Sequence, residues 1–252
     1  MCGLIPEQAH YAQAERDLDH VHEAPPPHFT PQDGLESKHH DRIIIYTDGA
    51  CRRNAHKRLR RAGCGGFWGQ GHAMNFSMPL PGRSQTNQRA ELLAALKVCE
   101  AEPRHIEIRS DSAYVCKGFH APASWRLNPS RVNADLWKRV QSILAPNPDR
   151  IMVSKVKGHA SWSDVAQGRV DFHDKVGNAE ADKLACQGAD SHASVSRMHA
   201  ASEERRTLAR RFHKHVLGIL KERLSLLSQL PELITGPPTG QNFARNVRRR
   251  LL

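Results

Sequence analysis

The chain has 252 residues, of which 39% are hydrophobic, and a formal net charge of +11 at pH 7. This length supplies one domain-sized core with extensions, and no apolar run approaches the roughly 18 residues that a membrane span requires. The positive charge favours a polyanionic partner, but it does not distinguish RNA, DNA or an anionic membrane, because counterion release from phosphates is independent of base sequence.

Charge and composition divide the sequence into three parts. Counting Lys and Arg against Asp and Glu, residues 1–41 carry −6, residues 42–190 carry +9 and residues 191–252 carry +8. The first part is acidic and proline-rich without apolar periodicity, which predicts a disordered leader that does not touch nucleic acid. Six cysteines without a C-x-x-C pair indicate free thiols in a reducing compartment. We therefore expect an intracellular protein, nuclear or cytoplasmic.

The middle part, residues 42–190, has the pattern of an α/β domain. Residues 43–47 form a β-branched run that is typical of a strand buried on both faces, and 63–71 and 73–80 suggest two more strands of an antiparallel meander. The order βββαβααβα predicts a mixed sheet with helices on its faces. The remaining expected elements are a helix after Thr86, a strand at 105–109, a short helix through 114–115, a helix at 133–144, a strand at 151–156 and a helix at 178–187.

Acidic residues occupy positions at strand ends and in core helices, where an unpaired charge is costly. Asp48 and Asp111 follow two strands that a parallel sheet would place side by side, and ligand sites gather at such strand ends. Glu91 and Asp182 lie in two of the expected helices. Converging carboxylates suit hard cations, and two Mg²⁺ ions about 3.5–4 Å apart can promote phosphodiester hydrolysis. His159, just after the last strand, would lie on a nearby loop and shuttle protons.

Each of these residues also has a plainer interpretation. Taken singly, Asp48 and Asp111 are common turn residues. Glu91 suits the dipole of its helix, and Asp182 and His159 read as a solvated helix residue and a loop or core histidine. Only their joint order within the expected elements favours a site.

Six sequence blocks follow one another in a fixed order. In this order they resemble the type 1 ribonucleases H, a family that includes the RNase H domains of reverse transcriptases. The resemblance implies a five-stranded mixed sheet, three antiparallel strands followed by parallel ones, flanked by helices. It also implies endonucleolytic cleavage of the RNA strand of an RNA–DNA hybrid, giving 3′-hydroxyl and 5′-phosphate ends. The blocks are YTDGAC at 46–51, TNQRAELLAAL at 86–96, SDSAYV at 110–115, VNADLWKRV at 132–140, VKGHA at 156–160 and GNAEADKLA at 177–185.

The resemblance also implies roles for particular residues. His159 matches the catalytic histidine of the family. The implied ligands of two Mg²⁺ ions, with Mn²⁺ as the other option, are Asp48, Glu91, Asp111 and Asp182. The positions that match the hybrid-binding groove and help to sense 2′-hydroxyls are Cys51, Asn54, Asn87 and Gln88. We add Arg52 and Arg53 as phosphate contacts and Trp125 as a contact to a backbone sugar, although a core position explains Trp125 equally well.

Three features depart from the family pattern. The loop after Asp48 is expanded and basic, and the segment between Asp111 and Asp135 is too short and too poor in basic residues to carry the basic handle of many cellular members. In addition, Asp182 follows His159 by 23 positions, more than in the commonest arrangement. We interpret the acids of this inserted loop, Asp164, Asp171 and Asp174, as exposed loop residues and not as metal ligands.

The last part, residues 191–252, predicts a basic amphipathic helix at 203–230. Such a helix packs on the domain or on a protein partner, lies on an anionic membrane, or extends the nucleic-acid surface, and we favour exposed arginines that strengthen hybrid binding by a monomer. Alternative functions are a catalytically inactive hybrid-binding module, the RNase H remnant of a retroelement polyprotein, and a DNA-cutting nuclease or integrase of the same broad fold.

Overall fold

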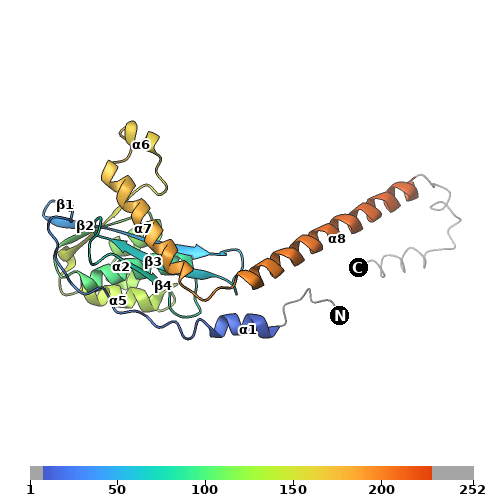
Figure 1. Ribbon diagram of the computed structural model, residues 1–252, viewed down its shortest axis with the longest axis horizontal. Coiled ribbons are helices and arrows are strands. Elements are labelled where there is room, and N and C mark those ends of the chain that lie inside the picture. The colour runs from blue at the N-terminus through green and yellow to red at the C-terminus, as the bar shows by residue number, and fades with distance from the viewer. Residues whose placement is uncertain (1–7, 229–252) are drawn as a thin grey trace. The chain divides into compact units, whose positions relative to one another are not determined.

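The structure is a computed structural model that describes residues 8–228 (Figure 1). The residues up to His199 belong to one compact unit and those from Ala200 onward to a second, and each unit is described by itself. Among the described helices, none is both long and apolar enough to cross a membrane.

A mixed sheet forms the centre of the first unit. It has the strand order β4-β3-β2-β5-β6, with β2, β3 and β4 antiparallel and β2, β5 and β6 parallel. The predicted five-stranded mixed sheet is therefore confirmed, and a two-residue strand, β1, adds to β2 in an antiparallel pair. The strands are β1 (Lys38–His39), β2 (Arg42–Arg52), β3 (Arg61–Phe67), β4 (Phe76–Pro79), β5 (Ile106–Ser110) and β6 (Ile151–Lys155).

Helices cover both faces of this sheet (Figure 1). Alternate residues of β2 point to opposite faces: Ile43 and Ile45 join the core formed with α2, α3 and α5, whereas Ile44 and Tyr46 pack with Ala181 of α7. Helix α7 begins six residues before its predicted start. The helices are α2 (Asn87–Ala101), α3 (Ala113–His120), α4 (Ala123–Arg126), α5 (Ala134–Leu144), α6 (Trp162–Ala166) and α7 (Phe172–Asp190), with a 3₁₀ turn at Pro148–Arg150.

Two glycines let the main helices lie directly on the sheet. A Cβ atom added at Gly49 of β2 would lie 2.3 Å from the backbone nitrogen of Glu91 in α2. A Cβ added at Gly65 of β3 would lie 2.5 Å from the backbone nitrogen of Ala185 in α7. Because no other residue tolerates these distances, glycine at both positions sets how closely the two helices approach the strands.

Residues 8–41 are held against the domain, so for them the expectation of a disordered leader is wrong. Helix α1 (Gln8–Arg16) and the turn after it bury Ala14 and Leu18. The acids of this segment pair with basic residues that lie 43 to 116 positions further along the chain, which local composition cannot reveal. The pairs are Glu15–Arg58, Asp19–Arg83, Glu23–Lys97, Glu23–Arg139 and Glu36–Arg104.

The second unit contains most of helix α8 (Ser196–Ser228), in agreement with the helix predicted at 203–230. Large apolar side chains along it are exposed, among them Leu208, Phe212 and Leu224. The end of the predicted tail, 229–252, and the first seven residues of the predicted leader lie outside the described residues.

The close approach at Gly49 gives a first prediction. In Gly49→Ala the new methyl group meets the backbone of α2, so we expect the free energy of unfolding in urea to fall by about 1–3 kcal/mol. Gly34→Ala is the matched control, because a Cβ at Gly34 has nothing within 4 Å. Equal stability of the two variants would contradict the packing described here.

Glu36 gives a second prediction, on acid stability. Burial raises the pKa of its carboxyl, but hydrogen bonds from Arg104, the backbone of Gln32 and His72 outweigh it and bring the pKa to about 2, below the usual 4.5. The stabilisation is therefore complete above pH 4.5 and is lost as the pH falls toward 2. Between pH 7 and pH 3, we expect the free energy of unfolding in urea to fall by about 1–2 kcal/mol more in the wild type than in Glu36→Gln. An equal loss in both proteins would show that this carboxylate does not anchor the segment.

Candidate active site

Two of the predicted carboxylates lie where parallel strands β2 and β5 end. Tyr46 of β2 pairs with Arg109 of β5, and two residues further on in the same direction the two strands lead to Asp48 and Asp111. Asp48 is 7% exposed, and one of its carboxylate oxygens accepts a hydrogen bond from the backbone nitrogen of Gly49 at 2.7 Å. The parallel register thus delivers both carboxylates to the same edge of the sheet, as the sequence predicted.

Helix α2 brings Glu91 to the same place. The helix starts after Thr86, whose side chain accepts a hydrogen bond from the backbone nitrogen of Arg89. One oxygen of Glu91 accepts from the side-chain amide of Asn87 at 2.6 Å, and the other accepts from the hydroxyl of Ser112. Donors from two different elements therefore fix both oxygens of this carboxylate.

Ser112 is a positioning residue that the sequence analysis missed. It follows Asp111 and serves as the N-cap of α3, accepting a hydrogen bond from the backbone nitrogen of Val115 at 3.3 Å. The sequence could have indicated this role, because a serine between a strand end and a helix start is a common N-cap. The cap fixes its side chain close to the strand-end carboxylate.

The loop after β6 passes directly against Asp111. A Cβ at Gly158 would lie 2.3 Å from the Oδ2 atom of Asp111, so any larger residue there would displace this carboxylate. The next residue, His159, has φ +48, a left-handed conformation that is uncommon for a residue other than glycine. Close packing at Gly158 and this backbone turn together place the histidine beside the carboxylates.

One cavity of about 270 Å³ collects these side chains. It brings together all five predicted catalytic residues and three of the predicted substrate contacts, Cys51, Arg52 and Asn87. Cys186, which was not predicted, lies one helical turn after Asp182 with its sulfur 3.8 Å from that carboxylate. The wall consists of Asp48, Gly49, Ala50, Cys51, Arg52, Asn87, Glu91, Asp111, His159, Asp182 and Cys186.

The other predicted contacts do not line this cavity. Gln88 is exposed beside Asn87, while Asn54 lies on the loop after β2 with its side-chain oxygen 3.8 Å from the sulfur of Cys51. Arg53 donates to the hydroxyl of Ser196 at 2.8 Å. These residues remain predictions as substrate contacts.

Trp125 is half-buried against the core. Its ring centre lies 5.4 Å from that of Trp137, and the guanidinium of Arg131 covers it at 3.8 Å. This packing agrees with the core interpretation that the sequence left open.

The basic groups near the cavity already have partners. Arg52 donates from two nitrogens to the carboxylate of Asp190, at 2.8 and 2.7 Å. Arg58, on the same loop, pairs with Glu15 of the N-terminal segment. A phosphate that binds at either arginine must therefore exchange with a carboxylate.

Burial and neighbouring carboxylates raise the pKa of two of these acids, Asp48 and Glu91. Burial raises the pKa of Asp48 to about 8, with further contributions from Asp111, Asp182 and Glu91 that outweigh the hydrogen bond from Gly49. Burial, aided by Asp111, also raises the pKa of Glu91 despite its bonds from Ser112 and Asn87. Within the cavity wall, Arg52 is the one arginine or lysine, and Asp190 neutralises it. The site therefore carries negative charge that it does not balance itself.

This donor set fits hard divalent cations. Carboxylate oxygens are the ligands that Mg²⁺ and Mn²⁺ prefer. The two thiols in the wall do not compete, because burial raises the pKa of both Cys51 and Cys186 and keeps them protonated.

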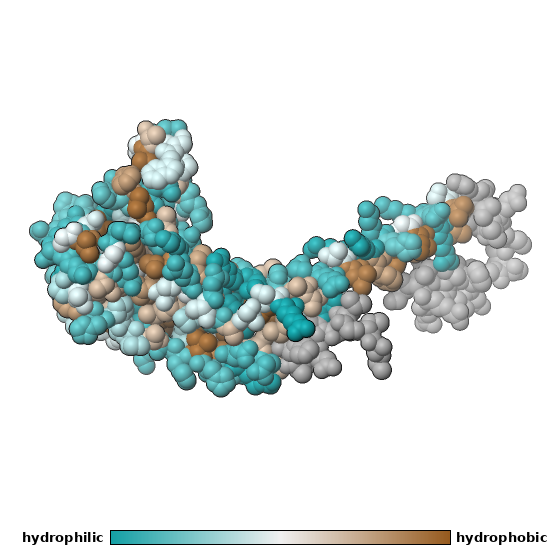
Figure 2. All heavy atoms as spheres, in the orientation of Figure 1, coloured by the Kyte–Doolittle hydropathy of each residue, from teal (hydrophilic) through white to brown (hydrophobic). Residues whose placement is uncertain are grey.

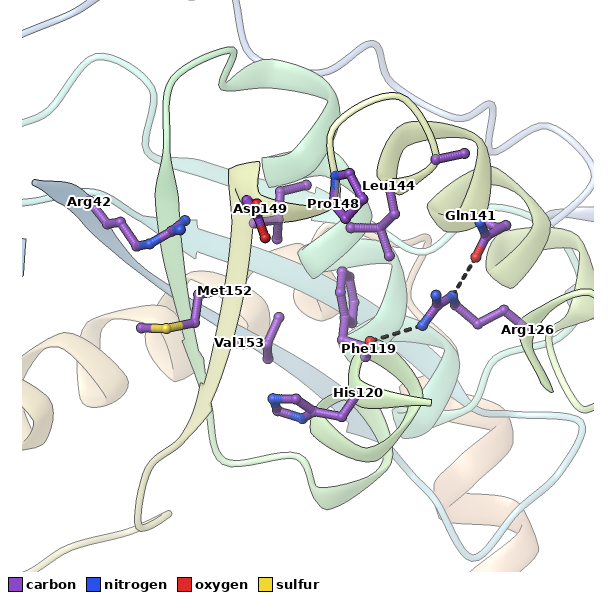
Figure 3. Close-up of a pocket in the computed structure, with 12 residues that line it drawn as sticks. Arg42, Phe119, His120, Arg126, Gln141, Leu144, Pro148, Asp149, Met152 and Val153 are labelled. Atoms are coloured by element: carbon purple, nitrogen blue, oxygen red, sulfur yellow. Dashed lines mark hydrogen bonds between the residues drawn. The ribbon is translucent and has the colours of Figure 1, made fainter. Parts of the chain in front are cut away.

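A larger cavity, of about 610 Å³, lies between β6 and the helices α3 and α5 (Figure 3). Its wall includes Arg42, Phe119 and Met152, and Arg126 bridges its edge to Gln141 and the carbonyl of Phe119. None of the predicted site residues lies in this wall, so size alone does not locate the functional site.

Comparison with known proteins agrees with this geometry. The RNase H family model matches residues 40–190. The chain is 34% identical over 157 residues to ribonuclease H of Schizosaccharomyces pombe, covering 59% of this chain and 53% of the relative. It is 35% identical over 159 residues to ribonuclease H1 of Mus musculus, covering 58% and 50%, and 35% identical over 160 residues to ribonuclease H of Rickettsia bellii, covering 58% and 88%.

The chain therefore belongs to the RNase H family, and the predicted type 1 RNase H domain is confirmed. It spans about half the length of the first two of these relatives.

The raised pKa of Asp48 gives a third prediction, on the metal-free protein. Because the folded-state pKa of about 8 lies above the usual 3.8, ionisation of Asp48 costs stability, and this cost grows as the pH rises from about 4 to 8. In the presence of a chelator at pH 8, we expect the free energy of unfolding of Asp48→Asn to be about 1–3 kcal/mol higher than that of wild type, with little difference at pH 4. The exposed Asp149→Asn serves as control, and a destabilised Asp48→Asn would contradict the repulsion described.

Proposed function

We propose that the chain is a ribonuclease H that hydrolyses the RNA strand of RNA–DNA hybrids with two divalent metal ions. The observation that carries the proposal is the convergence of four carboxylates in one cavity, where burial, followed by the neighbouring carboxylates, raises the pKa of Asp48 to about 8. The family membership agrees with the same activity.

The proposed ligands are Asp48, Glu91, Asp111 and Asp182. These residues would hold two Mg²⁺ or Mn²⁺ ions, which would supply activation of the attacking water and stabilisation of the departing 3′ oxygen, for a cleavage that gives 3′-hydroxyl and 5′-phosphate ends. Glu91 enters this set with both oxygens already oriented by Asn87 and Ser112, so little reorganisation is needed when a cation binds.

His159 is the proposed proton carrier. It lines the carboxylate cavity without being held in a strand or helix, on the loop that Gly158 packs against Asp111. Histidine is the side chain that most commonly serves as a general acid or base and as a proton shuttle. In this position it can take a proton from the attacking water or deliver one to the departing oxygen.

Asn87 links substrate sensing to the ligand set. Its amide nitrogen donates to Glu91, and its amide oxygen is an acceptor that suits a ribose 2′-hydroxyl. A ribonucleotide at this position therefore acts on the residue that orients Glu91, whereas a deoxyribonucleotide has no such donor. Cys51 and Arg52 line the same wall and are the other proposed contacts.

The test is cleavage of strand-labelled substrates by wild type, Asp111→Asn and the surface control Asp149→Asn. We expect metal-dependent cutting of the RNA strand in the hybrid, and no cutting of duplex DNA or duplex RNA. Asp111→Asn should lower kcat by at least about 100-fold, because a misplaced reacting group costs that much, while Asp149→Asn should match wild type.

Other outcomes of this experiment support the alternatives. Tight hybrid binding without cutting by the folded wild type would indicate an inactive binding module. Cutting of duplex DNA would indicate a nuclease or integrase of the same broad fold.

A further inference from the structure

The chain from the residue after His159 to the first turn of α7 forms an arm, defined as residues 160–175, which includes α6 (Figure 1). Asp164 holds it together. Its carboxylate accepts from the backbone and hydroxyl of Ser161, from Lys157 and from Arg169. The hydrogen bond from Lys157, followed by these other donors, holds the pKa of Asp164 well below its usual range.

The three acids of the arm differ in exposure: Asp164 is buried, Asp174 is half-buried, and Asp171 is exposed as the sequence predicted. Asp164 is 5% exposed, so the interpretation of it as an exposed loop residue is wrong. Asp171 caps α7 through the backbone nitrogen of His173, and Asp174 accepts from Arg109 and from the hydroxyl of Tyr46. The arm is therefore a built structure whose negative charges have internal partners.

Two large aromatic side chains lie exposed on this arm. Trp162 is 61% exposed and Phe172 53% exposed, and their ring centres are 6.0 Å apart with the planes tilted by 38°. The space-filling view shows hydrophobic side chains at the surface of the arm (Figure 2). The polar contacts of Asp164 hold the arm together, so the two rings are not needed to fold it. Two adjacent exposed aromatic rings are unfavourable in water, which indicates a binding surface.

Lys175 connects this aromatic pair to the catalytic cavity. Its ammonium nitrogen lies 5.1 Å from the ring centre of Trp162. The same lysine lines a small cavity of about 220 Å³ with Lys157, His159 and Asp182, and His159 and Asp182 also belong to the carboxylate cavity. A nucleic-acid strand that continues from the carboxylates past His159 therefore meets Lys175 first and the aromatic pair next.

We propose that Trp162 and Phe172 bind unpaired nucleotides that extend from the hybrid, with a base stacked on the rings and a phosphate at Lys175. Inside a duplex the faces of the bases are covered by their neighbours, so exposed rings beside a hybrid stack on unpaired bases or on a terminal base pair, which a blunt hybrid controls for. The adjoining lysine and the continuity with the catalytic cavity favour nucleic acid over a protein partner. The inference rests on the proposed function and adds a preference for hybrids that carry a single-stranded extension.

The test is equilibrium binding by the full chain carrying Asp111→Asn, which prevents cleavage. Fluorescence anisotropy compares a blunt hybrid with hybrids that carry an unpaired extension on the 5′ or 3′ end of either strand. We expect at least one extension to tighten binding by about fivefold or more, the lower end of what one stacked base contributes, and the position of that extension identifies the strand that meets the arm.

Substitutions then locate the contact. The double variant Trp162→Ser, Phe172→Ser should lose the preference for the extension, and Lys175→Gln should reduce it. Leu35→Ser is the matched control, because Leu35 is an exposed apolar residue that shortly precedes β1, which pairs with the opposite end of β2 from the carboxylates. It should keep the full preference.

The two possible failures are distinguishable. If Asp111→Asn binds no hybrid at all, the proposed function fails. If it binds blunt and extended hybrids equally, or if both the double variant and Lys175→Gln keep the full preference, only the role of the arm is overturned. Because the two aromatic side chains are exposed, the double variant should fold, and Lys175→Gln tests the same surface if it does not.

Discussion

Mutual repulsion of four carboxylates in one cavity is the constraint on which the rest of this structure depends. The parallel register of β2 and β5 fixes Asp48 and Asp111 at neighbouring strand ends, and Gly49 lets α2 approach until Glu91 joins them. Asn87 and Ser112 then hold Glu91 against that repulsion. The close packing of the fold thus concentrates carboxylate oxygens of the kind that divalent cations prefer as ligands.

Charge also organises the surface around the site. The catalytic part of the chain is basic and the N-terminal segment acidic, and the two attract one another through ion pairs such as Glu15–Arg58 and Asp19–Arg83. Most of these pairs are exposed and individually weak, but the buried Glu36 gives the segment a firm anchor. The segment is therefore part of the domain, and its carboxylates occupy arginines on the surface of the catalytic part of the chain.

The sequence predicted those features that local pattern determines. The apolar run of β2, the strand-end position of Asp111 and the N-cap at Thr86 are each visible within a few residues, and together they placed the carboxylates correctly in one cavity. Features that depend on distant partners were not predicted. Ion pairs with distant residues and a few scattered apolar contacts hold the N-terminal segment, and neither gives a local pattern. Asp164 resembled a loop residue because its donors Lys157 and Arg169 surround it only in the folded arm.

The most direct measurement of the central claim is the melting temperature of the full chain as Mg²⁺ is added to metal-free protein. If cation binding relieves the repulsion among the carboxylates, the melting temperature of wild type rises with Mg²⁺ concentration until the site saturates. The same titration of Asp48→Asn should give a much smaller rise, because part of the repulsion and one ligand are gone. A wild-type melting temperature that does not change with Mg²⁺ or Mn²⁺ would contradict the account of this cavity as a metal site.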